Sequence, residues 1–342
     1  MANKIASDPR VDPRIKAAFG DMPEPPSVKV DSREVLLASM KVLAESPELS
    51  PFAAVLRNRD FEALAPSDGL DIRTEEITSS PEGNRIILQI IRPESEGPLP
   101  CVYYIHGGGM AMMSAFDPHY SAWGRMIARK GVAVVMVEFR NSLMPGAVSD
   151  IAPYPGGLND CVSGLRWVLD NAGNLGIDSS RVVVSGDSGG GNLTMATGLA
   201  MKQAGEASRI KGLYALCPYL KGIWSDADGG SVVANGGLLM ELRYDNGAVA
   251  YGKEAFDAKD PLAWPGFASE ADLEGLPPVR INVNECDPLL DEGIELYRRL
   301  IRAGVSATCR TAIGTIHSTE TFLCCPDISE ALARDIAGFA TG

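Results

Sequence analysis

Apolar and polar positions along the chain follow two different periods. Short runs rich in β-branched residues predict strands, and the longer stretches between them repeat apolar residues at helical spacing. Strands are predicted over residues 70–77, 86–92, 101–105, 132–139, 181–185, 213–217, 279–284 and 307–312. Helices are predicted over residues 120–130, 158–171, 193–202, 289–303 and 329–339. This alternation predicts an α/β fold with a mostly parallel sheet, helices on both faces and an antiparallel edge.

Two stretches depart from this alternation. Residues 1–30 are rich in proline and charge, which predicts an arm laid over the surface rather than a packed element. Helical spacing begins at Ser32 and returns over residues 52–58, so residues 1–65 are expected to form an N-terminal cap segment. Residues 220–274 follow a strand without any strand pattern of their own, which is typical of a functional insertion, here a cap or lid. Residues 66–219 and 275–342 then form two parts of one domain.

A serine stands at the turn between the strand over residues 181–185 and the next helix, in Gly186-Asp187-Ser188-Gly189-Gly190. Glycines around a serine at such a turn are typical of a nucleophile elbow, where side chains would collide with the neighbouring strand and helix. The nucleophile of chymotrypsin-like proteases has similar neighbours, but its histidine precedes the serine in an all-β, disulfide-rich chain. The glycine spacing fits neither a dinucleotide loop nor a phosphate loop. An incidental serine in a plain glycine-rich turn is the alternative.

Only one of the three histidines, His317, follows Ser188, and it comes directly after the last predicted strand. A serine hydroxyl needs a histidine to take its proton, and α/β-hydrolases carry serine, acid and histidine in that order. His317 is therefore the predicted base. His106 and His119 precede the serine, and a surface-loop role is the alternative for His317.

The acid that orients the histidine is expected after the penultimate strand. Asp287 lies there, followed by Pro288, which suits the first position of a helix. Asp287 is the predicted third member of the triad, and a simple helix cap is its alternative role. Glu285 and Asp291 are the rival carboxylates.

Backbone amides are predicted to bind the negative oxygen that develops during acyl transfer. The strand over residues 101–105 runs into His106-Gly107-Gly108-Gly109, and residues without side chains let a substrate carbonyl approach the main chain. The amides of Gly108, Gly109 and Gly189 form the predicted oxyanion hole. Methionines adapt to irregular apolar ligands, so a substrate pocket is predicted from a small apolar set. That set is Met40, Met110 and Trp224, with Met112, Met113, Phe116 and residues 238–240 as neighbours.

Together these motifs resemble the hormone-sensitive-lipase-like group of carboxylesterases, bacterial family IV, from about residue 75 to the end of the chain. The resemblance implies an eight-stranded α/β-hydrolase sheet, a helical cap, and hydrolysis of short- to medium-chain carboxylic esters through an acyl-enzyme without a cofactor. Two departures stand out. Gly189 occupies a position where the group often has alanine, and residues 139–145 differ from the usual segment, so specificity transfers less readily than mechanism.

Composition narrows the class of protein. The 342 residues are 45% hydrophobic, which supplies a large core. The net charge of −13 argues against binding to nucleic acid or to an anionic membrane. Seven scattered cysteines without a Cys-x-x-Cys pair predict reduced thiols, and no signal-peptide core is present. We therefore expect a cytoplasmic enzyme.

The expected partner is a small-molecule ester, with no cofactor and no metal, and the sequence is compatible with a homodimer. Two other functions stay open. One is hydrolysis of amides or carbamates by the same triad. The other is ligand binding without catalysis on a hydrolase scaffold, as in plant hormone receptors that resemble this family but lack the histidine, whereas this chain has His317.

Overall fold

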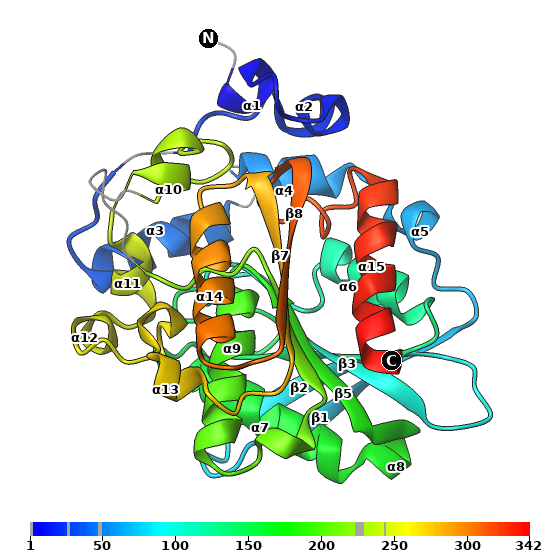
Figure 1. Ribbon diagram of the computed structural model, residues 1–342. Helices are drawn as coiled ribbons and strands as arrows, with labels where there is room; N and C mark the ends of the chain where they lie inside the picture. Colours follow the sequence, from blue (N-terminus) through cyan, green and yellow to red (C-terminus); the bar gives the residue numbers. More distant parts are fainter. Residues whose placement is uncertain (1–2, 26–27, 47–49, 223–228, 243) are drawn as a thin grey trace.

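The computed structural model describes residues 3–25, 28–46, 50–222, 229–242 and 244–342 (Figure 1). Eight strands form one sheet in the order β1-β2-β4-β3-β5-β6-β7-β8. Strand β2 runs antiparallel to both β1 and β4, and every other neighbouring pair is parallel. The predicted fold class is confirmed, including the antiparallel edge. The strands are β1 (Leu70–Thr78), β2 (Arg85–Pro93), β3 (Leu99–Ile105), β4 (Ala133–Glu138), β5 (Ile177–Asp187), β6 (Gly212–Leu216), β7 (Val279–Cys286) and β8 (Ala307–Ile316).

Helices cover both faces of this sheet, as the alternating pattern predicts (Figure 1). One face carries α6 (Pro118–Ala128) and α15 (Pro326–Thr341), which contact each other. The opposite face carries α7 (Gly156–Asp170), α9 (Gly189–Gln203) and α14 (Leu290–Arg302). Successive residues of a strand point to opposite faces, so in β3 Tyr103 packs in one core cluster and Tyr104 in the other. Two short elements, α8 (Ala172–Leu175) and η2 (Ala207–Arg209), lie in the chain just before β5 and β6.

The N-terminal residues are more ordered than the sequence predicts. They form α1 (Lys4–Ser7) and α2 (Pro13–Phe19), followed by α3 (Arg33–Glu45), α4 (Pro51–Arg57) and α5 (Phe61–Leu64). The prediction of an arm without packed elements was wrong, because α2 completely buries Ile15 and Phe19. Asp12 caps this helix and Pro13 takes its first position, where proline favours a helix start. The proline-rich composition thus marks a helix boundary.

The segment between β6 and β7 contains no strand among its described residues. It forms α10 (Gly230–Ala234), α11 (Asn246–Tyr251), α12 (Lys253–Asp257), η4 (Pro265–Phe267) and α13 (Glu270–Leu273). Helix α11 contacts α3, and the Asn246 side chain accepts a hydrogen bond of 2.9 Å from the Val30 amide. Two segments far apart in the sequence therefore lie side by side (Figure 1). Among the helices that the described residues form, none has the length and apolarity to cross a lipid bilayer.

A buried ion pair joins the end of β4 to α7. The Arg140 guanidinium donates to both carboxylate oxygens of Asp160 at 2.8 Å, and Asp160 is 1% exposed. The backbone amide of Arg140 also donates to Asp160 at 2.9 Å. At its outer end Arg140 meets Glu82, which is 32% exposed. The loop that leaves the sheet after β4 is thereby tied to the helix behind it.

We expect Asp160→Ala to lower the free energy of unfolding by about 3–5 kcal/mol, because it removes the buried partner of a largely buried guanidinium and leaves only the outer pair with Glu82. Glu82→Ala is the matched control on the same arginine, and its cost should stay below about 1 kcal/mol since that pair faces water. Urea unfolding followed by circular dichroism measures both values. Equal losses for the two variants would contradict this account.

Candidate active site

Ser188 lies at the turn between β5 and α9 with φ +56° and ψ −117°, a strained backbone conformation for a residue with a side chain. Its amide donates to the Leu216 carbonyl at 2.9 Å, which holds the turn against β6. A Cβ atom on Gly186 would lie 2.5 Å from the Ile105 carbonyl oxygen, and one on Gly190 only 2.0 Å from it. The glycines are therefore required by the close approach of β3. This packing presents a nucleophile elbow at the carboxyl edge of the sheet.

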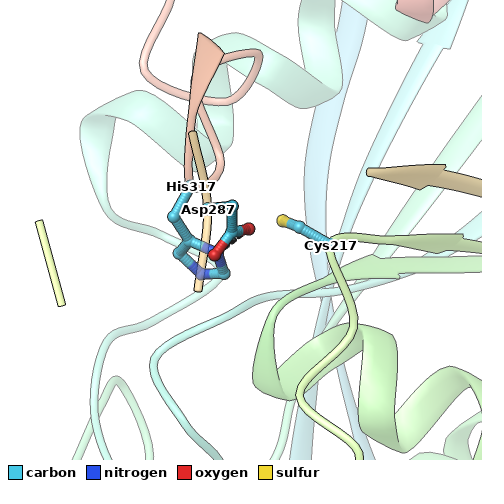
Figure 2. Close-up of side chains that lie close together, drawn as sticks. All are labelled: Cys217, Asp287 and His317. Atoms are coloured by element: carbon cyan, nitrogen blue, oxygen red, sulfur yellow. Dashed lines mark hydrogen bonds and ion pairs between the residues drawn. The ribbon is translucent and has the colours of Figure 1, made fainter. Parts of the chain in front are cut away.

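His317 and Asp287 come from the loops that follow β8 and β7, and their side chains point toward each other (Figure 2). His317 Nδ1 and Asp287 Oδ2 are 2.7 Å apart, and the two residues are 4% and 0% exposed. The other carboxylate oxygen of Asp287 accepts from the Leu289 amide at 2.9 Å, which fixes the carboxylate plane. The rivals are bound elsewhere: Glu285 accepts from the Gly314 amide and Asp291 from the Ser231 amide, both at 2.7 Å.

The electrostatic environment of His317 is set by burial and by one negative charge. Burial alone would lower the pKa of the imidazole, but the adjacent Asp287 carboxylate, with a further contribution from Cys217, outweighs it, so the pKa of His317 lies well above its usual value. A hydrogen bond from Nδ1 to Asp287 also fixes the tautomer that leaves Nε2 free to accept a proton. This is the arrangement that a general base requires.

Cys217, directly after β6, is the third side chain of this cluster (Figure 2). One donor atom from each of Cys217, Asp287 and His317 lies within 4.8 Å of the others. These donor types suit zinc, but ligand atoms in a tetrahedral zinc site lie about 3.3 Å apart, so the 2.7 Å contact fits a hydrogen bond instead. Burial raises the pKa of the Cys217 thiol, whose sulfur lies 3.2 Å from Ser318 Oγ. The geometry favours proton transfer over metal binding.

The predicted oxyanion residues lie together beside Ser188. Gly108 and Gly109 have φ values of +94° and +64° and line the same cavity as Ser188 and His317. A Cβ atom on Gly189 would lie 2.7 Å from the Gly109 amide nitrogen and 2.5 Å from that of Met110. The main chain after β3 thus packs directly against the residue that follows the serine.

Sequence reasoning missed the buried carboxylate of Asp187 as an organising centre. Tyr104 and Tyr120 donate to its two oxygens at 2.8 and 3.0 Å, and Ser318 donates at 3.1 Å. The Gly107 amide donates to the Tyr120 hydroxyl at 2.8 Å. Burial raises the pKa of Asp187, and these hydrogen bonds oppose the rise. The sequence did contain one signal: Asp187 lies at the end of an apolar strand, and a carboxylate buried there needs hydrogen-bond donors.

A second buried carboxylate steadies the loop that carries the histidine. Glu320 is 3% exposed and accepts hydrogen bonds from the side-chain amides of Asn282 and Asn284, both on β7, at 3.0 Å. Asn284 also donates to Thr315 at 2.7 Å. The loop after β8 is therefore anchored on both sides of His317. In the sequence, Asn282 and Asn284 lie in a predicted strand and Glu320 lies in the loop after His317. No local pattern indicates that their side chains form hydrogen bonds.

A cavity of about 460 Å³ opens over Ser188 and His317. Met40 lines it, whereas Met110 lies in the core with 1% exposure, because the turn after the oxyanion loop directs it inward. The predicted pocket residue Trp224 falls outside the described residues. Apolar side chains from the N-terminal helices, from the loop after β3 and from the segment between β6 and β7 form most of the lining. They include Leu36, Phe52, Met112, Met113, Leu239 and Met240, and they are joined by Leu143 from the loop after β4 and Phe322 from the loop after β8.

The sheet order and the loops at its carboxyl edge define an α/β-hydrolase. Residues 102–321 match the family described as alpha/beta hydrolase fold, and the chain belongs to that family. Within it, the chain belongs to the hormone-sensitive-lipase-like group, bacterial family IV, which the motifs indicated.

Three comparisons carry this assignment. The solved structure of esterase Est22 is 53% identical, covers 99% of this chain and 100% of that chain, and superposes with a TM-score of 0.93. Brefeldin A esterase, described as a bacterial homologue of human hormone-sensitive lipase, is 35% identical over 98% of this chain and 94% of its own, with a TM-score of 0.84. Carboxylesterase NlhH of Mycobacterium tuberculosis is 28% identical over 98% of both chains.

Gly189→Ala tests the packing of the oxyanion loop. The added methyl group would meet the backbone of Gly109 and Met110 rather than a flexible side chain, so we expect the loop to shift. The expected result is a fall in kcat of about 10-fold or more with little change in KM, because the predicted oxyanion amides would act on the transition state. Steady-state kinetics on p-nitrophenyl butyrate measure this.

Gly173→Ala is the matched control, since a Cβ atom there meets no other atom within 4 Å. That variant should keep the original kcat. An unchanged kcat for Gly189→Ala would show that the loop does not depend on this contact.

Proposed function

We propose that this protein is a serine carboxylesterase that hydrolyses short- to medium-chain carboxylic esters with Ser188, His317 and Asp287 as its triad. The observation that carries the proposal is the buried 2.7 Å contact between His317 and Asp287, with His317 lining the same cavity as the elbow serine. The esterases among its relatives support the reaction class. A cavity of about 460 Å³ with mostly apolar walls supports the substrate class.

The reaction begins when Ser188 Oγ attacks the ester carbonyl while His317 Nε2 accepts the hydroxyl proton. The carbonyl oxygen becomes negative and is bound by the amides of Gly108, Gly109 and Gly189. His317 then protonates the departing alcohol oxygen, which leaves the acyl group on Ser188. A water molecule then gives a proton to His317 and attacks the acyl carbonyl, which forms a second tetrahedral intermediate. As this intermediate collapses, the bond between the acyl carbon and Ser188 Oγ breaks, His317 returns the proton to Ser188 Oγ, and the acid is released.

The walls of the cavity contribute by excluding water. We propose that residues 1–65 and 220–274 act together as a cap over the catalytic domain. Leu36 and Met40 come from α3, and Leu239 and Met240 come from the segment between β6 and β7. Apolar walls lower the local dielectric constant, which strengthens each hydrogen bond to the developing oxyanion.

The redox state of the cysteines supports a location in a reducing compartment, for which we propose the cytoplasm. All seven cysteines are free thiols, and six of them are buried. A buried thiol packs as a small apolar side chain. The catalytic proposal does not depend on this location.

Ser188→Ala tests the nucleophile. Removal of the hydroxyl should lower kcat on p-nitrophenyl butyrate by about 10⁴-fold or more, since no acyl-enzyme can form. It should also abolish labelling by a fluorophosphonate probe, while the unfolding curve stays unchanged. Ser95→Ala, at an exposed turn, is the control and should keep both properties.

Labelling also separates the proposal from ligand binding without catalysis, because a non-catalytic protein would stay unlabelled. Matched ester and anilide substrates separate it from amide hydrolysis, and we expect the ester to react much faster. Turnover that survives in Ser188→Ala would refute the assignment of the nucleophile.

The pH dependence of kcat/KM tests the base. Only the neutral imidazole of His317 can accept the proton, and its pKa is raised, so activity should be lost as pH falls through a midpoint above the usual histidine value. Asp287→Asn removes the charge that raises the pKa and leaves the burial that lowers it. The midpoint should therefore move to lower pH, with kcat reduced by about 10⁴-fold.

Glu285→Gln is the matched control because Glu285 binds the Gly314 amide rather than the imidazole. Its pH midpoint should equal that of the unmodified protein. If the pH midpoint shifted in Glu285→Gln but not in Asp287→Asn, the assignment of Asp287 as the acid of the triad would be wrong.

A further inference from the structure

A second cavity of about 500 Å³ adjoins the one that contains Ser188. It lies between α4, the end of α3 and the loop that runs from β3 into α6. The two cavities share part of their lining, namely Ser50, Phe52, Met112 and Met113. The ring of Phe52 packs edge-on against Phe322, which lines the catalytic cavity, with ring centroids 5.1 Å apart. Apart from Ser50, the residues shared by the two cavities are apolar, and two of them are flexible methionines.

His119, at the start of α6, lines this second cavity and is 3% exposed. Its Nε2 atom is shielded from water and has no hydrogen-bond partner in the described part of the chain. Burial lowers the pKa of His119 to about 3, so the imidazole is neutral and has one nitrogen that can donate and one that can accept. Buried polar atoms normally have a partner, so Nε2 of His119 is a hydrogen-bonding group in the cavity wall that the described residues leave unsatisfied.

The charged groups of the lining favour an anion. Arg57 and Arg59 are both part of it, in a chain whose net charge is −13. Arg59 Nε is also shielded from water and has no hydrogen-bond partner among the described residues. The remaining charged group is Asp117, whose carboxylate accepts from the Ser114 amide at 3.1 Å. Burial raises the pKa of Asp117, which weakens its repulsion of an anion.

We propose that this second cavity binds a monocarboxylate with an apolar body, the class of acid that ester hydrolysis releases. Arg59 holds the carboxylate through its planar guanidinium, and His119 supplies a further hydrogen bond. The apolar body packs against Phe52, Met112 and Met113. Because these three side chains also border the catalytic cavity, an occupied second cavity restricts their movement and changes the turnover of bulky esters. The binding step itself does not depend on the proposed catalysis.

Titration calorimetry with sodium octanoate tests the proposal on the full chain. We expect saturable binding that Arg59→Met weakens by about 10-fold or more, because the charge-assisted hydrogen bonds are lost. Arg85→Met, on an exposed strand end, is the matched control and should bind octanoate as before. Ala53→Trp places a large side chain in the second cavity and should abolish binding, since Ala53 lines that cavity and not the catalytic one.

Two further measurements locate the ligand. 1-Octanol has the same body without the charge, and its binding should be weaker and insensitive to Arg59→Met. Protein labelled at Ser188 by a fluorophosphonate should still bind octanoate. Arg59→Met should keep the original kcat on p-nitrophenyl acetate, a substrate small enough for the catalytic cavity alone.

Three outcomes overturn the proposal: no binding at millimolar octanoate, equal affinity in Arg59→Met, or loss of binding after labelling, which would place octanoate in the catalytic cavity. Failure of the labelling reaction would instead count against Ser188 as nucleophile. The calorimetric comparison of Arg59→Met with Arg85→Met would still decide the question of binding. The two proposals therefore fail separately.

Discussion

The carboxylate of Asp187 is the point on which the loops of the active site converge. It is fully buried beside Ser188, and hydroxyl groups from β3, from α6 and from the loop after β8 donate to it. An isolated carboxylate would be costly in such a place, whereas one with several donors is stable. Each donor is linked to a loop proposed to act in catalysis, and Tyr104 lies on the strand that runs into the oxyanion loop. The amide of Gly107, at the start of the oxyanion loop, donates to the hydroxyl of Tyr120 on α6, and Ser318 directly follows His317.

This convergence explains how the strained turn at Ser188 persists. A residue with φ of +56° at this position costs free energy that its surroundings must supply. The turn is held by a hydrogen bond to β6 and by contact with the end of β3, where only glycines fit at Gly186 and Gly190. The same close approach brings the amides of the oxyanion loop against Gly189. Strain at the serine and preorganisation of the predicted oxyanion hole thus have one cause, the packing of two adjacent parallel strands.

The second cavity connects the surroundings of Ser188 to the N-terminal helices, because the two cavities share a wall. A wall of Phe52, Met112 and Met113 separates two apolar spaces, and only one of them contains the serine. Met112 and Met113 lie three and four residues after Gly109 in the chain. A ligand that displaces this wall would therefore act on residues covalently joined to the oxyanion loop. Specificity for the ester would then depend on the helices of the proposed cap as much as on the loops proposed to carry the triad.

Much of this protein is determined by its sequence. The alternation of strand and helix patterns defines the α/β sheet, and the glycine spacing around Ser188 and Gly108 identifies the two loops that meet at its carboxyl edge. The order of Ser188, Asp287 and His317 along the chain predicts His317 as the base among three histidines, and the structure brings it to Asp287 and to the cavity that contains Ser188. Local patterns are sufficient for these features, because the residues within a segment largely determine whether it forms a strand, a helix or a tight turn.

Other features were decided only by the tertiary structure. The N-terminal helices appear in the sequence as a proline-rich arm, because their stability comes from burying Ile15 and Phe19 against distant elements. Met110 resembled a pocket residue, and a turn after the oxyanion loop placed it in the core. Tyr104 and Tyr120 have no pattern that distinguishes them from other buried aromatic residues. Hydrogen bonds between residues far apart in the chain depend on three-dimensional packing, and no local period records them.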